Sequence, residues 1–439
     1  MKTQINNTQP IHEKMYLWAK DLFPFCRSIT GEGVRQTLGY IQKLLPGFKI
    51  KEIVSGTNVL DWSVPDEWNI LDAYVEDEAG NKIIDFMQHN LHIVGYSVPV
   101  DKWLSLEELN EHLYSLPDKP QAIPYRTSYY EKRWGFCMRD CDRKKLKPGK
   151  YHVVIDSTLQ PGVLNYGELI LPGKEEKEVL LSTYICHPSM ANNELSGPVV
   201  TAALARWVMG LKNRRYTYRI IFIPETIGSI VYLSRHLKEM KDKTIAGYNV
   251  TCVGDNRAYS FMPSKYGDTL VDRLTVHVLK YYAPNYIHCS FLERGSDERQ
   301  YCSVGVDLPV VSLMRTRYGD YPEYHTSLDD LSVISPDGLG GAYEGIRKCL
   351  YLLENNYLYL ATCIGEPQLG KRGLRSTLGA KALTTDTATL MHILQYADGN
   401  HDLIELAEII GVYAEDCIPI IERLVDEKLL SLIQDRITR

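Results

Sequence analysis

From about residue 175 onward, the chain alternates short, continuously apolar segments with longer segments whose apolar residues recur at helical spacing. The apolar segments predict four strands, which read KEVLLSTYI, TYRIIFIPE, GYNVTCVGD and LPVVSLMR. Helices are predicted after them, reading GPVVTAALARWVMGL, GSIVYLSRHLKEM, DTLVDRLTVHVLKYYA and SPDGLGGAYEGIRKCLYLLENNYLYL. Continuously apolar strands that alternate with helices are typical of a mostly parallel sheet with helices on both faces. The predicted fold class is therefore α/β.

The rest of the chain has other patterns, which predict two further domains. Residues 11–45 have helical spacing and are assigned to the α/β domain, which we predict over 1–50 and 170–365. Residues 51–169 hold short alternating stretches interrupted by prolines and turn pairs, which indicates an inserted β-rich domain. After a glycine-rich linker, apolar spacing in 370–439 predicts a helix–turn–helix followed by a winged element.

Charge argues against some classes of function. The 439-residue chain has a net charge of −6, which does not favour a general nucleic-acid-binding or membrane-surface role. Residues 390–439 hold ten Asp or Glu against four Lys or Arg, the reverse of what phosphate binding needs. We therefore expect no DNA binding despite the winged-helix pattern, and we interpret this domain as a packing or homo-oligomerisation element.

The ends and the cysteines of the chain bear on its compartment. No apolar run reaches the roughly 18–20 residues that a membrane span needs. The N-terminal sequence MKTQINNTQP has no apolar signal-peptide core. Ten cysteines are scattered without a CxxC pair, which favours free thiols and argues against a cysteine metal site. The expected compartment is the cytoplasm.

Residues that carry chemistry follow the predicted strands. His187, Glu225 and Asp255 each come directly after one strand, and His325 lies in the loop after the fourth. Because ligands of open α/β sheets collect at the carboxyl ends of strands, we expect these side chains on one rim. Imidazole and carboxylate are ligands of catalytic Zn²⁺, and a further carboxylate near the metal can act as a base. Cys186 is not expected to act as a nucleophile, because neighbours on an extended strand point to opposite faces.

Four motifs resemble those of the zinc-dependent exopeptidases, the aminopeptidases with co-catalytic zinc. HPSMANNELSG resembles their histidine and ANDNxSG segment, IPETIGS their Glu-Glu-x-Gly segment, CVGD their third ligand strand, and YHTSLDD their last ligand loop. RSITGEGVRQTL and RGSDERQYC are similar to segments of a bacterial group of aminopeptidase-like proteins linked to surface polysaccharide loci. That group carries an inserted β-domain and a C-terminal winged-helix domain, so the resemblance covers nearly the whole chain.

The resemblance implies roles for the residues at the strand ends. His187, Asp255 and His325 are implied metal ligands, with zinc as the implied metal. Glu225 is either the general base, which takes the proton of a zinc-activated water, or a metal ligand. The relatives divide these two jobs between adjacent glutamates, whereas position 226 of this chain is Thr.

Asn193 occupies the place of the relatives' bridging aspartate, and it is the fifth implied metal ligand. A bridging carboxylate neutralises charge between two cations, but an amide offers one carbonyl oxygen and no charge. We therefore expect one zinc ion, weak binding or a displaced second site.

Polar residues near the last two motifs are candidates for substrate binding. Asp297 resembles a position close to the substrate in the relatives, and Glu298 offers a carboxylate for a substrate amine; a solvated loop explains both equally well. Arg315 and Tyr324 flank His325 and are suited to a substrate carboxylate or an oxyanion. Arginines in such loops, Arg317 included, are more often partners of nearby acids such as Asp320.

Three hypotheses about function follow. The favoured one is a metal-dependent hydrolase of amide or peptide bonds, which acts on a peptide, a small amide or a glycan precursor. The alternative is a catalytically impaired binding or scaffolding protein on the same fold, since Asn193 replaces the bridging aspartate. A transcription regulator is the third, and it depends on the C-terminal domain alone.

Overall fold

A computed structural model describes residues 9–374 and 385–433 of the protein. Three segments lie outside the described residues: the first eight residues, residues 375–384 of the predicted linker region, and the last six residues. The chain divides into two compact units, and each is described by itself. They comprise Met1–Lys265 with Ile287–Glu344, and Tyr266–Tyr286 with Gly345–Arg439.

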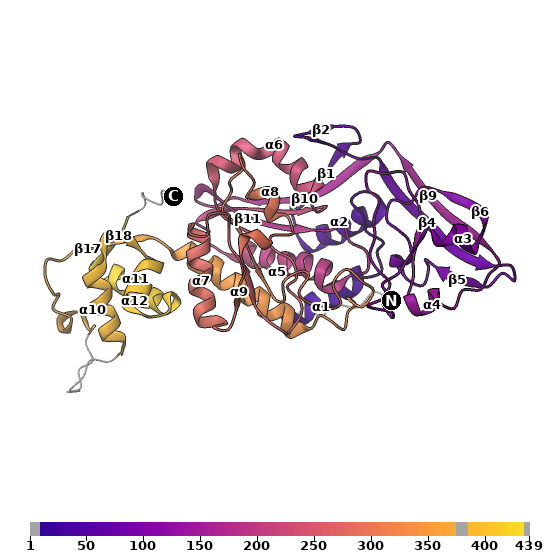
Figure 1. Ribbon diagram of the computed structural model, residues 1–439. Helices are drawn as coiled ribbons and strands as arrows, with labels where there is room; N and C mark the ends of the chain where they lie inside the picture. The colour runs from indigo at the N-terminus through magenta and orange to yellow at the C-terminus, as the bar shows by residue number, and fades with distance from the viewer. Residues whose placement is uncertain (1–8, 375–384, 434–439) are drawn as a thin grey trace. The chain divides into compact units, whose positions relative to one another are not determined.

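A mixed eight-stranded sheet forms the centre of the first unit (Figure 1). Its order is β1-β10-β12-β11-β13-β16-β14-β15, and the central strands β12, β11, β13 and β16 are parallel. The strands are β1 (Lys49–Val54), β10 (Val163–Leu171), β11 (Glu175–Tyr184), β12 (Tyr216–Ile223), β13 (Thr244–Asn249), β14 (Ser260–Met262), β15 (Ile287–His288) and β16 (Val310–Met314). The parallel centre lies between helices on both faces, which confirms the predicted α/β class.

Helices cover the two faces of this sheet. In Figure 1, α5 and α1 lie on one side of it and α6 on the other, where α6 also contacts α8. All residues of α5 from Ser196 to Ala205 are buried, which explains why this helix is apolar on most of its surface. The helices of this unit are α1 (Ile11–Leu22), α2 (Glu32–Leu44), α5 (Ser196–Gly210), α6 (Ile227–Lys243) and α8 (Glu298–Tyr301). Helix α9 (Pro336–Asn355) begins in this unit and is assigned to the second unit from Gly345 onward.

The predicted β-rich insertion contains a separate antiparallel sheet of order β5-β4-β9-β6. On β9, Tyr151, Val153 and Ile155 are buried while their neighbours are more exposed, which is the alternation of a half-buried strand. The outer strands β1 and β10 of the predicted insertion belong to the large sheet. The remaining elements are β2 (Asn58–Val59), β3 (Trp62–Ser63), β4 (Glu67–Asp77), β5 (Lys82–Asp85), β6 (Val100–Ser105), α3 (Leu106–Asn110), β7 (Leu113–Tyr114), β8 (Phe136–Cys137), α4 (Asp140–Arg143) and β9 (Lys150–Gln160).

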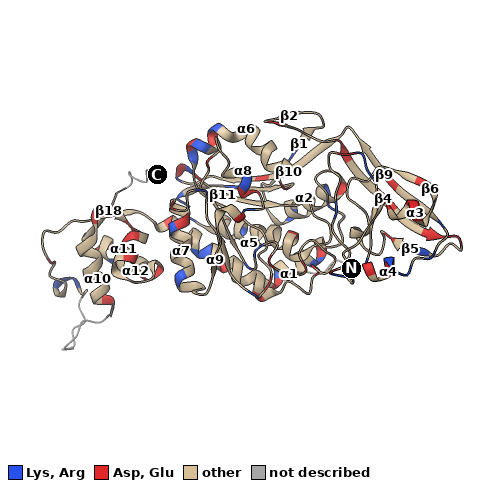
Figure 2. Cartoon of the chain, viewed as in Figure 1, with Lys and Arg blue, Asp and Glu red and all other residues tan. Residues whose placement is uncertain are grey.

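The second unit contains the winged helix, as predicted. A three-stranded antiparallel sheet of order β18-β17-β19 accompanies three helices. The turn between α11 and α12 begins at Gly411, whose φ of 77° suits a helix C-terminus. The elements are α10 (Thr385–Tyr396), α11 (Leu403–Ile410), α12 (Ala414–Asp426), β17 (Leu358–Ala361), β18 (Asp398–Asp402) and β19 (Leu430–Ile433). Figure 2 shows acidic residues on α11 and α12.

Helix α7 (Leu270–Tyr282) belongs to the second unit, although the sequence pattern places it within the strand–helix alternation. Its His277 accepts a hydrogen bond from the Ala414 amide at Nε2 (3.0 Å) and pairs with Glu408 through Nδ1. These contacts join α7 to α11 and α12. Within the described ranges, no helix combines the length and the apolar character that crossing a membrane requires.

Candidate active site

The loop after β11 carries His187 and is buried throughout. It ends in the π-helical turn η2 (Ala191–Leu195), which leads directly into α5. Asp329 holds the start of this turn: its carboxylate accepts the Asn192 amide at 2.7 Å and the Asn193 amide at 2.9 Å. A carboxylate is favoured there because the first amides of a helical turn have no partner within the turn. Burial raises the pKa of Asp329 to about 6.

His187, Glu225 and His325 line one cavity of about 380 Å³. Nε2 of His187 lies 3.6 Å from Oε2 of Glu225, and the two imidazole rings are 5.6 Å apart between centroids. Glu225 follows β12, and its amide donates to the Cys186 sulfur at 3.2 Å. The structure therefore brings together three of the predicted site residues from three strand ends.

The electrostatics of the cavity suit a cation. Burial, assisted by His187, lowers the pKa of His325 to about 3, so that its imidazole is neutral at pH 7. Burial raises the pKa of Glu225, while His187 and Arg299 oppose that shift. Two imidazoles and a carboxylate are the donor types of a catalytic zinc site, so these residues fit the implied metal.

A buried carboxylate fixes the orientation of His187. Its Nδ1 lies 2.8 Å from Oε2 of Glu194, which leaves Nε2 to face Glu225. Arg27 from the segment after α1 pairs with Glu194 at 3.5 Å and donates to the His187 carbonyl at 2.9 Å. The side chains of Arg27 and Glu194 are fully buried. Burial lowers the pKa of His187, and the Glu194 carboxylate opposes that shift.

Cys186, His187 and Glu194 also form a compact group of potential metal ligands. However, Glu194 already occupies Nδ1 of His187, and burial raises the pKa of Cys186 to about 11, which keeps its thiol protonated. A thiolate is the form that binds metals or attacks substrates. We therefore interpret this group as the support of His187, and it does not favour a Cys186 nucleophile.

The β-rich insertion holds the His325 loop directly. The Tyr125 amide donates to the His325 carbonyl at 2.9 Å, beside an isolated bridge between Pro124 and Thr326. His325 has a φ of 55°, an unusual value for a non-glycine residue. Its ring stacks on Tyr324 at 3.9 Å, and the Tyr125 ring lies 5.2 Å away. The strained backbone is thus supported from two sides.

Asp255 lies beneath the loop and does not line the cavity. Its carboxylate accepts four hydrogen bonds, at 2.7–3.0 Å, from Asn192, Arg257 and Thr316. A carboxylate has about four acceptor sites, so these donors use its capacity. Its role as a metal ligand remains a prediction.

Asn193 is also buried beside the cavity and does not line it. Its Oδ1 accepts from the Tyr184 hydroxyl at 3.3 Å, and among the described residues its Nδ2 has no hydrogen-bond partner. The structure thus leaves one polar atom of this amide unsatisfied.

The predicted substrate-binding acids serve the local structure. Glu298 accepts four hydrogen bonds, from the Gly295 and Ser296 amides and Tyr318 at Oε1 and from Asn249 at Oε2, so its carboxylate is engaged in the local structure. Asp297 accepts from the Thr226 amide and from the Ser229 hydroxyl, both at 2.8 Å.

Asp297 is nevertheless coupled to the cavity. Burial and the nearby Glu225 raise its pKa to about 7. Its Oδ2 is buried and has no partner among the described residues. The charge of Glu225 therefore acts on this buried carboxylate.

The basic residues of the last motif lie outside the cavity. Arg315 packs over the ring of Tyr259 at 3.9 Å. Arg317 forms two hydrogen bonds with Asp320 at 2.8 Å, as the structural alternative predicts. Tyr324, in contrast, contacts a cavity residue through its stacking on His325.

Four site residues are absent from the sequence prediction: Arg27, Tyr125, Glu194 and Asp329. Arg27, Glu194 and Asp329 lie within the sequence motifs quoted above, and their presence in those motifs was the signal that could have identified them. Tyr125 lies in the insertion, and no pattern in the sequence around it indicates a functional role.

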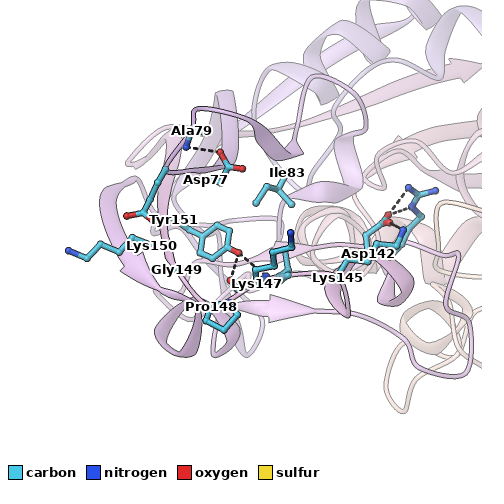
Figure 3. A pocket seen from close by; sticks show the side chains of 13 residues that line it. Asp77, Ala79, Ile83, Asp142, Lys145, Lys147, Pro148, Gly149, Lys150 and Tyr151 are labelled. Carbon is cyan, nitrogen blue, oxygen red and sulfur yellow. Dashed lines mark hydrogen bonds and ion pairs between the residues drawn. The ribbon is translucent and has the colours of Figure 1, made fainter.

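A larger hollow of about 620 Å³ lies in the insertion (Figure 3). Two of the basic residues on its wall, Arg139 and Lys145, are paired with Asp142.

The fold is that of an aminopeptidase-like protein. A zinc aminopeptidase from Bacillus subtilis has the same fold, with a TM-score of 0.56, 14% identity, and coverage of 78% of this chain and 95% of that one. A peptidase M28 precursor from Shewanella amazonensis aligns with a TM-score of 0.55, 11% identity, and coverage of 81% and 97%.

The chain itself belongs to the family described as a domain of unknown function, DUF4910, which matches residues 16–356; a winged helix-turn-helix family matches 357–432. A Clostridium acetobutylicum protein is 42% identical over 96% of this chain and 98% of its own, and its provisional name refers to polysaccharide biosynthesis and an aminopeptidase-like domain. A crystal structure of a provisionally named peptidase from C. acetobutylicum aligns with a TM-score of 0.90 and 41% identity over 96% of both chains.

Proposed function

We propose that this protein is a metal-dependent hydrolase of amide or peptide bonds, of the aminopeptidase type, with one zinc ion. The observation that carries the proposal is the convergence of His187 Nε2, His325 and Glu225 on one cavity. His187 and His325 would hold the ion. The absence of a bridging carboxylate at Asn193 favours one ion over two.

The side chains have distinct tasks in this reaction. When bound, zinc polarises the scissile carbonyl and lowers the pKa of a nearby water. Glu225 accepts the proton of the attacking water and passes it to the leaving amine; its raised pKa favours both transfers at neutral pH. Glu194 keeps His187 in one orientation, and Tyr125 keeps the His325 loop in place.

The substrate class follows from the relatives. Aminopeptidase-like neighbours favour a peptide or a small amide. The name of the Clostridium relative refers to polysaccharide biosynthesis, so an amide-bearing glycan precursor is the second substrate class that we propose.

Metal analysis and an activity assay test this function together. We expect about one zinc per chain in the purified protein and zinc-stimulated release of a chromophore from aminoacyl amides. A protein that holds no metal and gains no activity from added metal contradicts the proposal. Such a result would favour the binding or scaffolding protein, which the four hydrogen bonds on Asp255 also favour.

Asn193→Asp separates a weakened enzyme from a binding protein. We expect the metal-free variant to lose about 1–3 kcal/mol of unfolding free energy, because the new carboxylate is buried without a positive partner. Zinc should restore this loss and raise the metal content or the activity, since the carboxylate supplies the missing charge. Urea denaturation with and without zinc measures the effect.

A matched buried amide provides the control for that variant. Asn249 is fully buried at the end of β13 and bonds to Glu298, outside the cavity. Asn249→Asp should destabilise the protein equally with and without zinc. If Asn193→Asp has the same urea denaturation curve with and without zinc and its activity is unchanged, the result favours the binding or scaffolding protein.

We propose that the C-terminal unit serves packing or oligomerisation and does not bind DNA. Residues 390–439 carry ten acidic and four basic side chains. Anisotropy of a labelled random duplex at low salt should therefore show no salt-sensitive binding. Tight binding that weakens steeply with salt would overturn this assignment.

A further inference from the structure

One wall of the active-site cavity comes from the β-rich insertion. Trp62 on β3 and the segment 125–130 contribute Tyr125, Thr127, Tyr129 and Tyr130 to the lining. This segment is fixed to the catalytic loop, because Tyr125 bonds to His325 and the Ser327 amide bonds to the Ile123 carbonyl at 2.9 Å. The wall is therefore a built part of the site.

The wall combines aromatic faces with free, uncharged hydrogen-bonding groups. Trp62 and Tyr130 are 40% and 53% exposed and meet edge to face at 5.6 Å. In the described parts of the chain, the Trp62 indole N–H and the Tyr130 and Thr127 hydroxyls have no hydrogen-bond partner. Tyr125 and Tyr129, in contrast, bond to each other at 2.7 Å. All aromatic wall residues are Trp or Tyr, so each has a polar edge.

The charge of the lining limits the ligand. Lys and Arg are absent from the lining as far as the structure describes it, and Glu225 is the only carboxylate there. A phosphate or carboxylate on the ligand would therefore meet no Lys or Arg at this wall and would face the carboxylate of Glu225. The complementary ligand is uncharged where it touches the wall.

We infer that this wall binds the face of a neutral pyranose ring. The ring belongs to a substrate in which it is joined to a second group through an amide, and that amide is the bond cleaved beside Glu225. The apolar C–H face of a sugar ring packs on the Trp62 and Tyr130 rings, while its hydroxyls pair with the free donors. A purely apolar ring would fill the same space but leave these donors without partners, which costs about 1–3 kcal/mol for each buried group. The cleavage part rests on the proposed function, whereas binding of the ring does not.

Two acetamides that share a six-membered ring and differ in its hydroxyls, its hydroxymethyl group and its ring oxygen test the inference by calorimetric titration. N-acetylglucosamine presents a pyranose, and N-cyclohexylacetamide presents an apolar ring of similar size. We expect the first to bind about tenfold more tightly or better. Trp62→Ala should weaken its binding about tenfold and Tyr130→Phe about threefold, since the first removes a ring face and the second one hydroxyl.

Trp103→Ala is the matched control, because Trp103 is 52% exposed on β6 of the same insertion and does not line the cavity. It should bind both probes as the unchanged protein does. Equal or tighter binding of the cyclohexyl probe, no binding of either probe, or equal effects of Trp62→Ala and Trp103→Ala would overturn the inference.

The two proposals can fail separately. If the protein binds the sugar amide but holds no zinc and cleaves no amide, the proposed hydrolase activity is refuted and the proposal of sugar binding at the wall is supported. If zinc-dependent cleavage of aminoacyl amides does not depend on a sugar ring or on Trp62, the proposal of sugar binding at the wall is refuted and the proposed hydrolase activity is supported.

Discussion

Arg27→Met should lower the free energy of unfolding by about 3–5 kcal/mol. Arg27 and Glu194 are both fully buried, and removing the guanidinium leaves the carboxylate with the His187 imidazole but without its cationic arginine partner in the protein interior. The substitution also removes donors from the His187 and Leu22 carbonyls, at 2.9 and 2.7 Å. Urea denaturation followed by circular dichroism measures the change.

The double variant Arg27→Met/Glu194→Gln distinguishes charge from packing. Removing both charges eliminates the uncompensated carboxylate, so we expect part of the lost stability to return. Arg35→Met is the control, because Arg35 is 31% exposed in its ion pair with Glu67 and should cost no more than about 1 kcal/mol. Equal effects of Arg27→Met and Arg35→Met would contradict the assignment of a buried charge pair.

Glu194→Gln alone should weaken zinc binding about 10–100-fold, measured by competition with a chelator. Gln retains a carbonyl that can accept the His187 Nδ1 proton, but it removes the negative charge that makes the imidazole a better donor. Unchanged zinc affinity would refute a supporting role of Glu194.

The strand ends were predictable because continuous apolar runs mark buried strands, and their parallel carboxyl ends meet at one edge of the sheet. This reasoning brought His187, Glu225 and His325 together correctly. It gives the position of a residue along the chain but not the partners of its side chain. Asp255 also follows a buried strand, yet Thr316 and Arg257 occupy its oxygens.

Contacts between segments that are distant in the sequence could not be predicted from local sequence patterns. Tyr125 reaches His325 through a single isolated bridge, which leaves no periodic signal in the insertion. Helix α7 has the amphipathic pattern of a surface helix, but that pattern does not reveal which unit covers its apolar face. Its contacts within the second unit include the pairing of His277 with Glu408 and Ala414.

Glu225→Gln should reduce kcat for amide hydrolysis about 100–10,000-fold while zinc content stays unchanged. A glutamine at this position keeps the size of the side chain but cannot accept the proton of the attacking water. Among the described residues, no other carboxylate lines the cavity: Asp297 accepts from the Thr226 amide and Ser229, and Glu298 accepts from four donors of the local structure. Steady-state kinetics and metal analysis of the same preparation check both parts of the expectation.

The metal content of Glu225→Gln decides between the two roles open to this residue. Loss of zinc together with activity would identify Glu225 as a ligand, which the 3.6 Å separation from His187 Nε2 also permits. Retained zinc with lost activity identifies the base. Glu293→Gln, at an acid 48% exposed outside the cavity, should alter neither quantity. Position 226 is Thr, so Glu225 is followed by no second glutamate that could take one of the two roles.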